Sequence, residues 1–401
     1  MSITTDNPAT DGTVDAVARA RALQGLVDQQ AAASEDLGQL TQDIDDALHE
    51  QGLYGMWVPK SLGGLELDPI TSLEVLEAVS YAQPSAGWVL MAAALSSGTG
   101  AAYLGDNAIE AMFTDVERWP IIAGQGTRPG VAKQVDGGLT ISGDWSFGSG
   151  IKHAQYAHSA VIVEETGEFR ITVVPLEKVN LDNDSWDVLG LRATGSIDYT
   201  MRDVFVPEGY SHFGLQQESA RGGALYKLGI IQLALVCHSG WALGVGRRIL
   251  DELAGMAQKK AGRAGQIAES DAFQMGFADA EAKYRAARAF VFESWRDAWT
   301  TLQTDEQLST RQATLLRVAL SHVTWTVNEV SEFAYRNGGT TALRDGTMQR
   351  LFRDVHAGTQ HITSAPGVIK AAGKELAGLA PDSSWVFLDI VGPDATGPAA
   401  H

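Results

Sequence analysis

The sequence predicts an α+β protein that begins with a helical domain, continues into an antiparallel β-domain and ends in a helical bundle. Apolar residues recur at helical spacing up to about residue 114 and again from about residue 216, with short strand-like runs between. We therefore expect a disordered tail over 1–13, helices over 14–114, the β-domain over 115–215 and the bundle over 216–401. A ligand would bind where these parts meet.

Helical spacing in the first part comes from two apolar stripes and two longer apolar segments. The first stripe is Ala16, Ala20, Leu23, Val27 and Ala31, and the second is Leu37, Leu40, Ile44 and Leu48. After a turn rich in Pro and Gly, the segments Ile70 to Tyr81 and Ala86 to Leu95 predict two more helices.

The middle part reads as strands because its apolar runs are short and end at turn-forming residues. The runs are Leu139 to Ser142, Ser159 to Glu164, Phe169 to Val174 and Tyr199 to Val206. Two long stripes then predict the bundle helices: Phe273, Phe277, Ala280, Tyr284, Ala287, Val291 and Trp295, followed by Ala313, Leu316, Leu320, Val323, Val327, Val330 and Ala334. Asn337-Gly338-Gly339 predicts the end of the second helix.

Composition limits the partners and the compartment. The net charge of −19 argues against binding to nucleic acid or to anionic membranes. The N-terminus has neither the basic start nor the apolar core of a signal peptide, and the most apolar stretch, Leu228 to Val245, is broken by polar residues. The single cysteine, Cys237, allows no intrachain disulfide and is expected to be buried. We expect a cytoplasmic protein with no membrane partner.

Three motifs stand in a fixed order. Gly143 to Ala154 reads GDWSFGSGIKHA, Leu189 to Ser196 reads LGLRATGS, and Gln349 to His361 reads QRLFRDVHAGTQH. Together they resemble the acyl-CoA dehydrogenase superfamily. They are most similar to its monooxygenase branch, the oxygenase components of two-component flavin-dependent monooxygenases such as 4-hydroxyphenylacetate hydroxylase and dibenzothiophene monooxygenase. The resemblance extends from about Val17 to Leu379.

A flavin needs backbone close to its ring and a hydrogen-bonding group at its N5 edge. Gly148 and Gly150 leave room for close approach on either side of the Ser149 hydroxyl. The resemblance implies that Ser149 contacts this edge and stabilises the oxygenated flavin; the alternative is an ordinary turn serine. Gln125 and Thr127 occupy the segment that lines the ring in this family, or else belong to a polar loop.

Other candidate flavin contacts carry alternatives too. Trp145 and Phe147 alternate along a predicted strand, so each is either a core residue or a wall of the cofactor site. Arg192 either contacts a phosphate or forms a structural ion pair. Ser196 is expected to approach the flavin or its phosphate.

The C-terminal motif separates the two branches of the family. Acyl-CoA dehydrogenases of the commonest type carry a catalytic Glu about nine residues after the Arg of Arg-Asp, but the window from Thr359 to Ala365 has no carboxylate. Instead His361 follows Arg353 by eight residues, which is the monooxygenase pattern. We expect it on the same helix as His356, with the two side chains pointing about 140° apart. The resemblance implies an imidazole beside the reacting face of the flavin; the alternative is a packed or surface histidine.

One departure from the family bears on the substrate. Related hydroxylases carry a histidine after the helix that contains Trp88, where this chain has Leu95-Ser96-Ser97-Gly98. That histidine helps to deprotonate phenols, so its absence favours an indole, a sulfur compound or an amine.

The sequence thus predicts an oxygenase that uses reduced FMN or FAD and O₂ on a small aromatic or heteroaromatic substrate. It contains no metal motif. It also contains no nicotinamide-binding Gly-x-Gly-x-x-Gly after a strand, which fits a separate NAD(P)H–flavin reductase as partner. A homotetramer is expected from the family. The alternatives are an FAD-dependent acyl-CoA dehydrogenase and a flavin-binding scaffold without chemistry.

Overall fold

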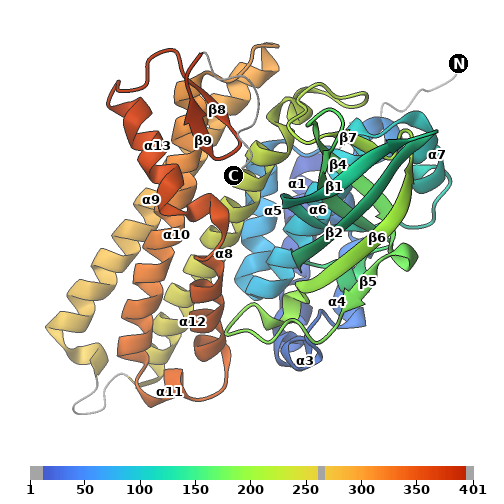
Figure 1. Ribbon diagram of the computed structural model, residues 1–401. Helices are drawn as coiled ribbons and strands as arrows, with labels where there is room; N and C mark the ends of the chain where they lie inside the picture. The colour runs from blue at the N-terminus through green and yellow to red at the C-terminus, as the bar shows by residue number, and fades with distance from the viewer. Residues whose placement is uncertain (1–11, 261–266, 394–401) are drawn as a thin grey trace, which may run out of the picture.

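A computed structural model describes residues 12–260 and 267–393. It confirms the α+β class and the order helices, sheet, helices (Figure 1). The predicted tail lies outside the described residues except for its last two, which begin α1. The first seven α-helices are α1 (Gly12–Ala22), α2 (Gln24–Gln29), α3 (Ala31–Leu37), α4 (Gln42–Glu50), α5 (Pro69–Ala82), α6 (Pro84–Tyr103) and α7 (Asp106–Phe113).

The two N-terminal stripes are more broken than the sequence predicts. The first is divided among α1, α2 and α3. The second does not form one helix from Leu37, because Gly38 adopts a left-handed φ of +63° and ends α3, and α4 begins only at Gln42. Leu37 is consequently exposed, whereas Leu40 is buried in the connection between the two helices.

The β-domain is one seven-stranded sheet with the order β5-β6-β2-β1-β3-β4-β7. Its strands are β1 (Ile122–Val135), β2 (Gly138–Gly148), β3 (Tyr156–Val163), β4 (Phe169–Pro175), β5 (Asn180–Asp182), β6 (Ile197–Pro207) and β7 (Ser211–Phe213). The four predicted runs fall in β2, β3, β4 and β6, and only Glu164 lies beyond the end of its strand. The expectation of a wholly antiparallel sheet is wrong at one place: β1 pairs with β3 in parallel, since the chain leaves β2 and returns on the other side of β1.

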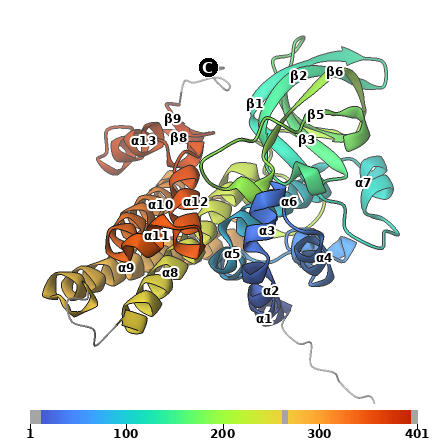
Figure 2. The ribbon, with the colours of Figure 1, turned by 90° about the horizontal axis from the view of Figure 1, so that it is seen from below.

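Long helices form the last part, as the stripes predict. The long helices are α8 (Gly229–Lys260), α9 (Asp271–Gln303) and α10 (Thr310–Gly338), of which the stripes predict α9 and α10. The shorter α11 (Thr340–Leu343), α12 (Thr347–Gly358) and α13 (Pro366–Leu376) follow, and then the unpredicted hairpin β8 (Ser384–Val386) and β9 (Asp389–Val391). α10 ends at Gly338, with Gly339 as its cap, as predicted. Figures 1 and 2 show the bundle on one side of the molecule and the sheet on the other, with α5 and α6 between them.

Helix α8 is the central element of the core and packs against α5, α6 and α10. Within the described residues, one helical stretch, Ala224–Lys259, is long and apolar enough to span a membrane, yet it is mostly buried inside the protein. Its composition is therefore that of a core helix. Cys237 on α8 is buried as expected, with its Sγ 3.6 Å from the Met91 carbonyl, and burial raises the pKa of this thiol.

Candidate active site

The end of β2 brings the backbone of Ser149 and Gly150 against neighbouring elements. Gly150 has a left-handed φ of +76°, and a Cβ at this position would lie 3.3 Å from the Val89 side chain on α6. Its N–H donates to the Thr194 carbonyl at 3.0 Å, which fastens β2 to the 3₁₀ turn η5 (Arg192–Thr194). A glycine therefore suits this position both in conformation and in space.

A chain of hydroxyl groups fixes the side chain of Ser149. Trp88 Nε1 donates to Ser149 Oγ at 3.1 Å, Ser149 Oγ lies 2.7 Å from Ser196 Oγ, and Ser196 Oγ lies 2.7 Å from Thr194 Oγ1. The Thr194 hydroxyl donates to the Leu191 carbonyl at 2.8 Å. A hydroxyl has one proton, so Ser196 must donate to Thr194 and Ser149 to Ser196. Ser149 Oγ keeps one lone pair, with which it can accept a hydrogen bond from a ligand.

Two histidines and two tryptophans pack next to this hydroxyl chain. We call Trp88, His238, Trp241 and His361 the aromatic–imidazole cluster. Trp88 lies edge-on to Trp241, His238 and His361, with ring centroids 5.1, 4.9 and 5.7 Å apart, and the centroids of the two imidazoles are 3.8 Å apart. Through Trp88 the cluster is directly hydrogen-bonded to Ser149. The structure therefore brings together Ser149 and His361, the two predicted catalytic residues.

His361 reaches the cluster from a turn rather than from a helix. α12 ends at Gly358, and His361 caps the short 3₁₀ turn η8 (Ile362–Ser364). The expectation that His361 continues the helix of His356 is therefore wrong, because Gly358 ends it. His361 Nδ1 lies 2.8 Å from Thr363 Oγ1 and 3.4 Å from the Thr363 nitrogen, and burial lowers the pKa of the imidazole to about 4.

His238 is a member of the site that the sequence did not single out. It lies on α8 and is 8% exposed. Burial, and next the neighbouring His361, hold the pKa of His238 well below its usual value, so the ring is neutral. The available signal was one imidazole within the most apolar stretch of the chain, and no motif distinguishes such a residue from a packed histidine.

The second and third sequence motifs contact each other. A Cβ on Gly190 would lie 2.2 Å from the Arg353 carbonyl oxygen, so only glycine fits against α12 there. The Leu191 N–H donates to Asp354 Oδ1 at 2.6 Å, and Arg353 pairs with Glu35. Burial raises the pKa of the Asp354 carboxyl to about 7. These residues hold the β-domain turn on the bundle.

Gln125 and Thr127 lie on an irregular part of β1 rather than in a loop. The register of β1 shifts between Gln125 and Gly130. Gln125 Oε1 accepts from the backbone nitrogens of Thr127 and Arg128 at 3.2 and 2.8 Å, and its amide nitrogen donates to the Thr127 hydroxyl. Both predicted side chains thus support their own bulge.

Trp145, Phe147 and Arg192 have different environments. Trp145 is buried in the sheet, stacked on Tyr199 with centroids 5.6 Å apart, and its Nε1 donates to the Ala160 carbonyl at 3.0 Å. That is the core position the sequence left open. Phe147 is 65% exposed with a φ of +66°, and its ring lies edge-on to Trp186, with centroids 6.1 Å apart. Arg192 donates to the Val188 carbonyl at 3.1 Å and forms an ion pair with Asp187. An ion pair of this kind is the structural role that the sequence left open beside a phosphate contact.

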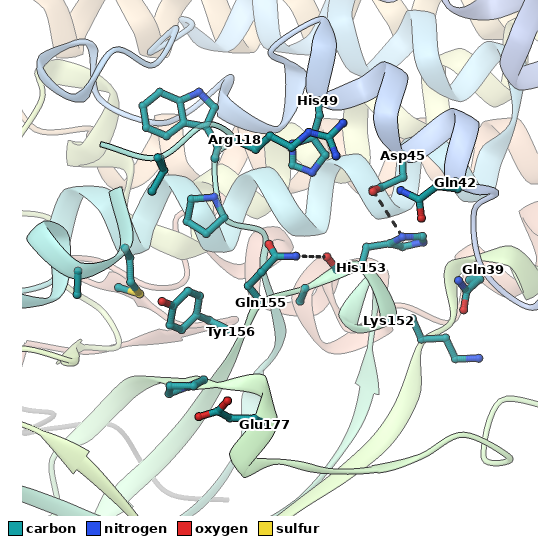
Figure 3. A pocket seen from close by; sticks show the side chains of 17 residues that line it. Gln39, Gln42, Asp45, His49, Arg118, Lys152, His153, Gln155, Tyr156 and Glu177 are labelled. Atoms are coloured by element: carbon teal, nitrogen blue, oxygen red, sulfur yellow. Dashed lines mark hydrogen bonds and ion pairs between the residues drawn. The ribbon is translucent and has the colours of Figure 1, made fainter. Parts of the chain in front are cut away.

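A separate cavity of about 820 Å³ lies between α4, the segment after α7 and the 3₁₀ turn η3 (Ile151–His153) (Figure 3). Its lining mixes basic and acidic side chains. His153 lies 3.5 Å from Asp45, which also accepts from the Tyr54 hydroxyl at 2.9 Å. None of the predicted site residues lines it. Across the described residues, no cluster of His, Cys, Asp and Glu could hold a metal ion.

Comparison with known proteins places the chain in a family. Residues 14–111 match the model "Acyl-CoA dehydrogenase, N-terminal domain" and residues 236–366 match "Acyl-CoA dehydrogenase, C-terminal domain". The chain is 30% identical over 388 residues to indole-3-acetate monooxygenase of Pseudomonas putida, with 93% of this chain and 94% of the relative covered. This chain therefore belongs to the acyl-CoA dehydrogenase superfamily.

Within that superfamily the relatives are oxygenases. The chain is 28% identical to the flavin-dependent monooxygenase oxygenase subunit HsaA of Rhodococcus jostii, over 87% of this chain and 94% of HsaA. The crystal structure of 3-HSA hydroxylase from Rhodococcus sp. RHA1 superposes with a TM-score of 0.84 at 25% identity, covering 91% and 97% of the two chains. XiaF from Streptomyces sp., in complex with FADH2 and glycerol, has a TM-score of 0.84 at 23% identity, covering 92% and 96%. The protein is thus the oxygenase component of a flavin-dependent monooxygenase that uses reduced flavin and O₂ on an aromatic substrate, as the sequence predicts.

Proposed function

We propose that this oxygenase acts on small N–H heteroaromatic compounds of the indole class. The observation that carries the proposal is the aromatic–imidazole cluster, in which indole edges and two neutral imidazoles lie beside Ser149. Aromatic walls favour a flat apolar ring, and neutral imidazoles can hydrogen-bond a ring N–H without requiring a charged substrate. Two curated relatives are named for indole-3-acetate, which supports the same class.

The residues beside the cluster fit a reduced flavin. The N5 atom of reduced flavin carries a hydrogen, and Ser149 Oγ has one free lone pair with which it can accept a hydrogen bond from this N–H. Gly148 and Gly150 let the backbone on either side of Ser149 pack against Tyr199 and Val89, and exposed Phe147 offers an aromatic ring. When bound, reduced flavin supplies the activation of O₂. We propose that Ser149 holds its N5 edge, and that Gly148, Gly150, Phe147 and Ser196 surround it.

Four other predicted contacts need separate treatment. Gln125 and Thr127 remain proposed contacts of the flavin ring, made by the bulge they support. Arg192 is partly exposed and is proposed to reach the flavin phosphate. Trp145 supports the site from the core, since its indole nitrogen is already bonded within the sheet.

His361 is proposed to act on the substrate side. If Nδ1 accepts from the Thr363 nitrogen, the ring proton is on Nε2, which can donate a hydrogen bond into the site. The low pKa keeps the ring neutral at cellular pH. In the other tautomer Nδ1–H donates to the Thr363 hydroxyl, and the bare Nε2 can take a proton from the reacting substrate. The neighbouring tryptophans exclude water from this position.

The experiment that tests the function supplies reduced FMN or reduced FAD from an NAD(P)H–flavin reductase, with O₂ and a panel of indoles, phenols and thiophenes. We expect mass-shifted products carrying one added oxygen from the indoles. Oxidation of phenols alone would contradict the indole class, and flavin oxidation that yields only hydrogen peroxide with every aromatic would contradict the function itself.

Partner and assembly are proposed on the same basis. A separate reductase is supported by relatives named as oxygenase subunits or components. A homotetramer is supported by large apolar side chains exposed on the bundle, among them Trp325, Leu343 and Leu379. Light scattering after size exclusion tests the tetramer, and a monomer at micromolar concentration would contradict it. A cytoplasmic location is proposed from the sequence, and fractionation tests it.

A further inference from the structure

His238 is the one member of the aromatic–imidazole cluster whose ring has no hydrogen-bond partner among the described residues. His361 has Thr363, Trp88 has Ser149, and Trp241 donates to the Pro84 carbonyl at 2.9 Å. The His238 side chain is 8% exposed, so more than nine-tenths of it is removed from solvent. Polar groups this deep take a hydrogen bond from the protein, from water or from a ligand. The His238 ring nitrogens are not among the fully buried polar atoms without a partner, so they border space that water or a ligand can enter.

The neighbours of His238 indicate a ligand. One face of its ring is covered by His361, at 3.8 Å between centroids, and Trp88 lies edge-on at 4.9 Å. Trp88 in turn holds Ser149, the proposed flavin contact, at 3.1 Å. His238 is therefore separated by a single aromatic ring from the proposed flavin contact.

Neutrality restricts what the imidazole can do. A neutral imidazole has one bare ring nitrogen, which accepts, and one N–H, which donates. The cluster around it has no carboxylate to favour a charged ring, and His361 is itself neutral. The bare nitrogen of His238 is thus available to a donor such as a ring N–H.

We propose that His238 is the substrate-binding histidine of this site, whose bare ring nitrogen accepts a hydrogen bond from the N–H of a heteroaromatic substrate. The inference rests on the proposed function. The inference explains how the site distinguishes a heteroaromatic ring with an N–H from a ring of the same shape that lacks the N–H. Trp241 and Trp88 select a flat ring, and His238 selects the ring that carries an N–H.

Rigid support makes this selection effective. The Trp241 ring is fixed to α6 through Pro84, and a Cβ on Gly358 would lie 2.2 Å from it, so the end of α12 packs flat against it. Three helices therefore hold the cluster, and a ring nitrogen on α8 has a defined position relative to Ser149. Because the acceptor nitrogen has a fixed position, a substrate without an N–H at the matching place loses the hydrogen bond and is discriminated against.

The test compares indole with benzofuran, in which an oxygen replaces the N–H at nearly unchanged shape. Binding is followed without flavin by isothermal titration calorimetry, because indole fluoresces in the same range as tryptophan, and oxygenation is followed with the reductase system. We expect the wild-type protein to bind indole about 2- to 13-fold more tightly than benzofuran, the equivalent of one hydrogen bond. His238→Phe should lose this preference, and His238→Gln, whose amide oxygen can accept, should restore part of it.

The matched control is His322→Phe, which removes an exposed histidine of α10 outside the cluster and should leave the preference unchanged. If His238→Phe keeps the full preference for indole in binding and in turnover, the assignment of His238 is wrong while the proposed function stands. If the wild-type protein oxygenates no indole, the proposed function fails, and the binding preference then decides separately whether His238 reads the N–H. Circular dichroism and thermal melting of each variant show that a lost preference does not come from unfolding.

Discussion

Replacing Ser149 with Ala tests the proposed flavin contact most directly. The change removes the lone pair that would accept the N5 proton, a hydrogen bond with a net value of about 0.5–1.5 kcal/mol. It also leaves the Trp88 N–H and the Ser196 hydroxyl without the Ser149 oxygen they contact at 3.1 and 2.7 Å. Because Trp88 is buried, its stranded N–H should lower the free energy of unfolding by about 1–3 kcal/mol.

The assay for Ser149→Ala is coupling: the hydrogen peroxide released per reduced flavin oxidised, against oxygenated product. Losing 0.5–1.5 kcal/mol of stabilisation should raise the peroxide fraction about 2- to 13-fold relative to product. Ser142→Ala on the same strand, whose hydroxyl bonds Asp203 at the surface, is the control and should leave coupling unchanged. If Ser149→Ala couples as well as the wild type while its melting temperature falls, Ser149 is only a structural hydroxyl and the assignment is refuted.

Three further outcomes are expected. His361→Ala should slow product formation by roughly 10²-fold with little change in flavin affinity, and His361→Asn should recover activity only if the role is hydrogen bonding; chromatography measures both, with His356→Ala on α12 as a near-neutral control. Burial lowers the pKa of His158 to about 3 and of His212 to about 4, so between pH 6.5 and 4 the unfolded chain binds more protons; urea titrations should show stability falling by about 2 kcal/mol per histidine from pH 7 to 5, and a flat profile would contradict their burial as neutral rings. The pKa of Asp354 is raised to about 7, so the folded state holds its proton and stability is lost as the pH rises from about 4 through 7; Asp354→Asn should gain about 2–4 kcal/mol over the wild type at pH 8 relative to pH 4, and equal pH profiles would refute this.

Periodic features of the sequence were enough to predict the bundle and most of the sheet. The stripes that predict α9 and α10 consist of residues that share one buried face, and the Gly339 cap needs only local conformation. The strand β1 was missed because Gln125 to Gly130 contains Gly and Pro, the residues of a turn. A bulge allows them inside a strand, since Pro129 falls within the register shift and need not donate to the ladder.

The site was predicted only in part, for a different reason. Motif spacing was enough to identify Ser149 and His361. It misplaced His361 on α12, although Gly358 was the available stop signal. His238 was missed because its neighbours come from α6 and η8, more than a hundred residues away in the chain. Contacts of that kind depend on how α8 packs, which no local pattern records.

The three motifs occur together because they form one continuous hydrogen-bonded path. Asp354 on α12 accepts from the Leu191 N–H, and the Leu191 carbonyl accepts from Thr194. From there the path continues through Ser196 and Ser149 to Trp88, whose ring contacts His361. Gly190, Leu191 and Asp354 therefore need not touch substrate or flavin to be required. Gly190 lets the turn lie on α12, Asp354 fixes its backbone, and the turn orients the serine. A change at Asp354 that displaced this turn would reach Ser149 through these four hydrogen bonds and through the Gly150 N–H, which donates to the Thr194 carbonyl. The position of the Ser149 hydroxyl is therefore set by the junction between bundle and sheet.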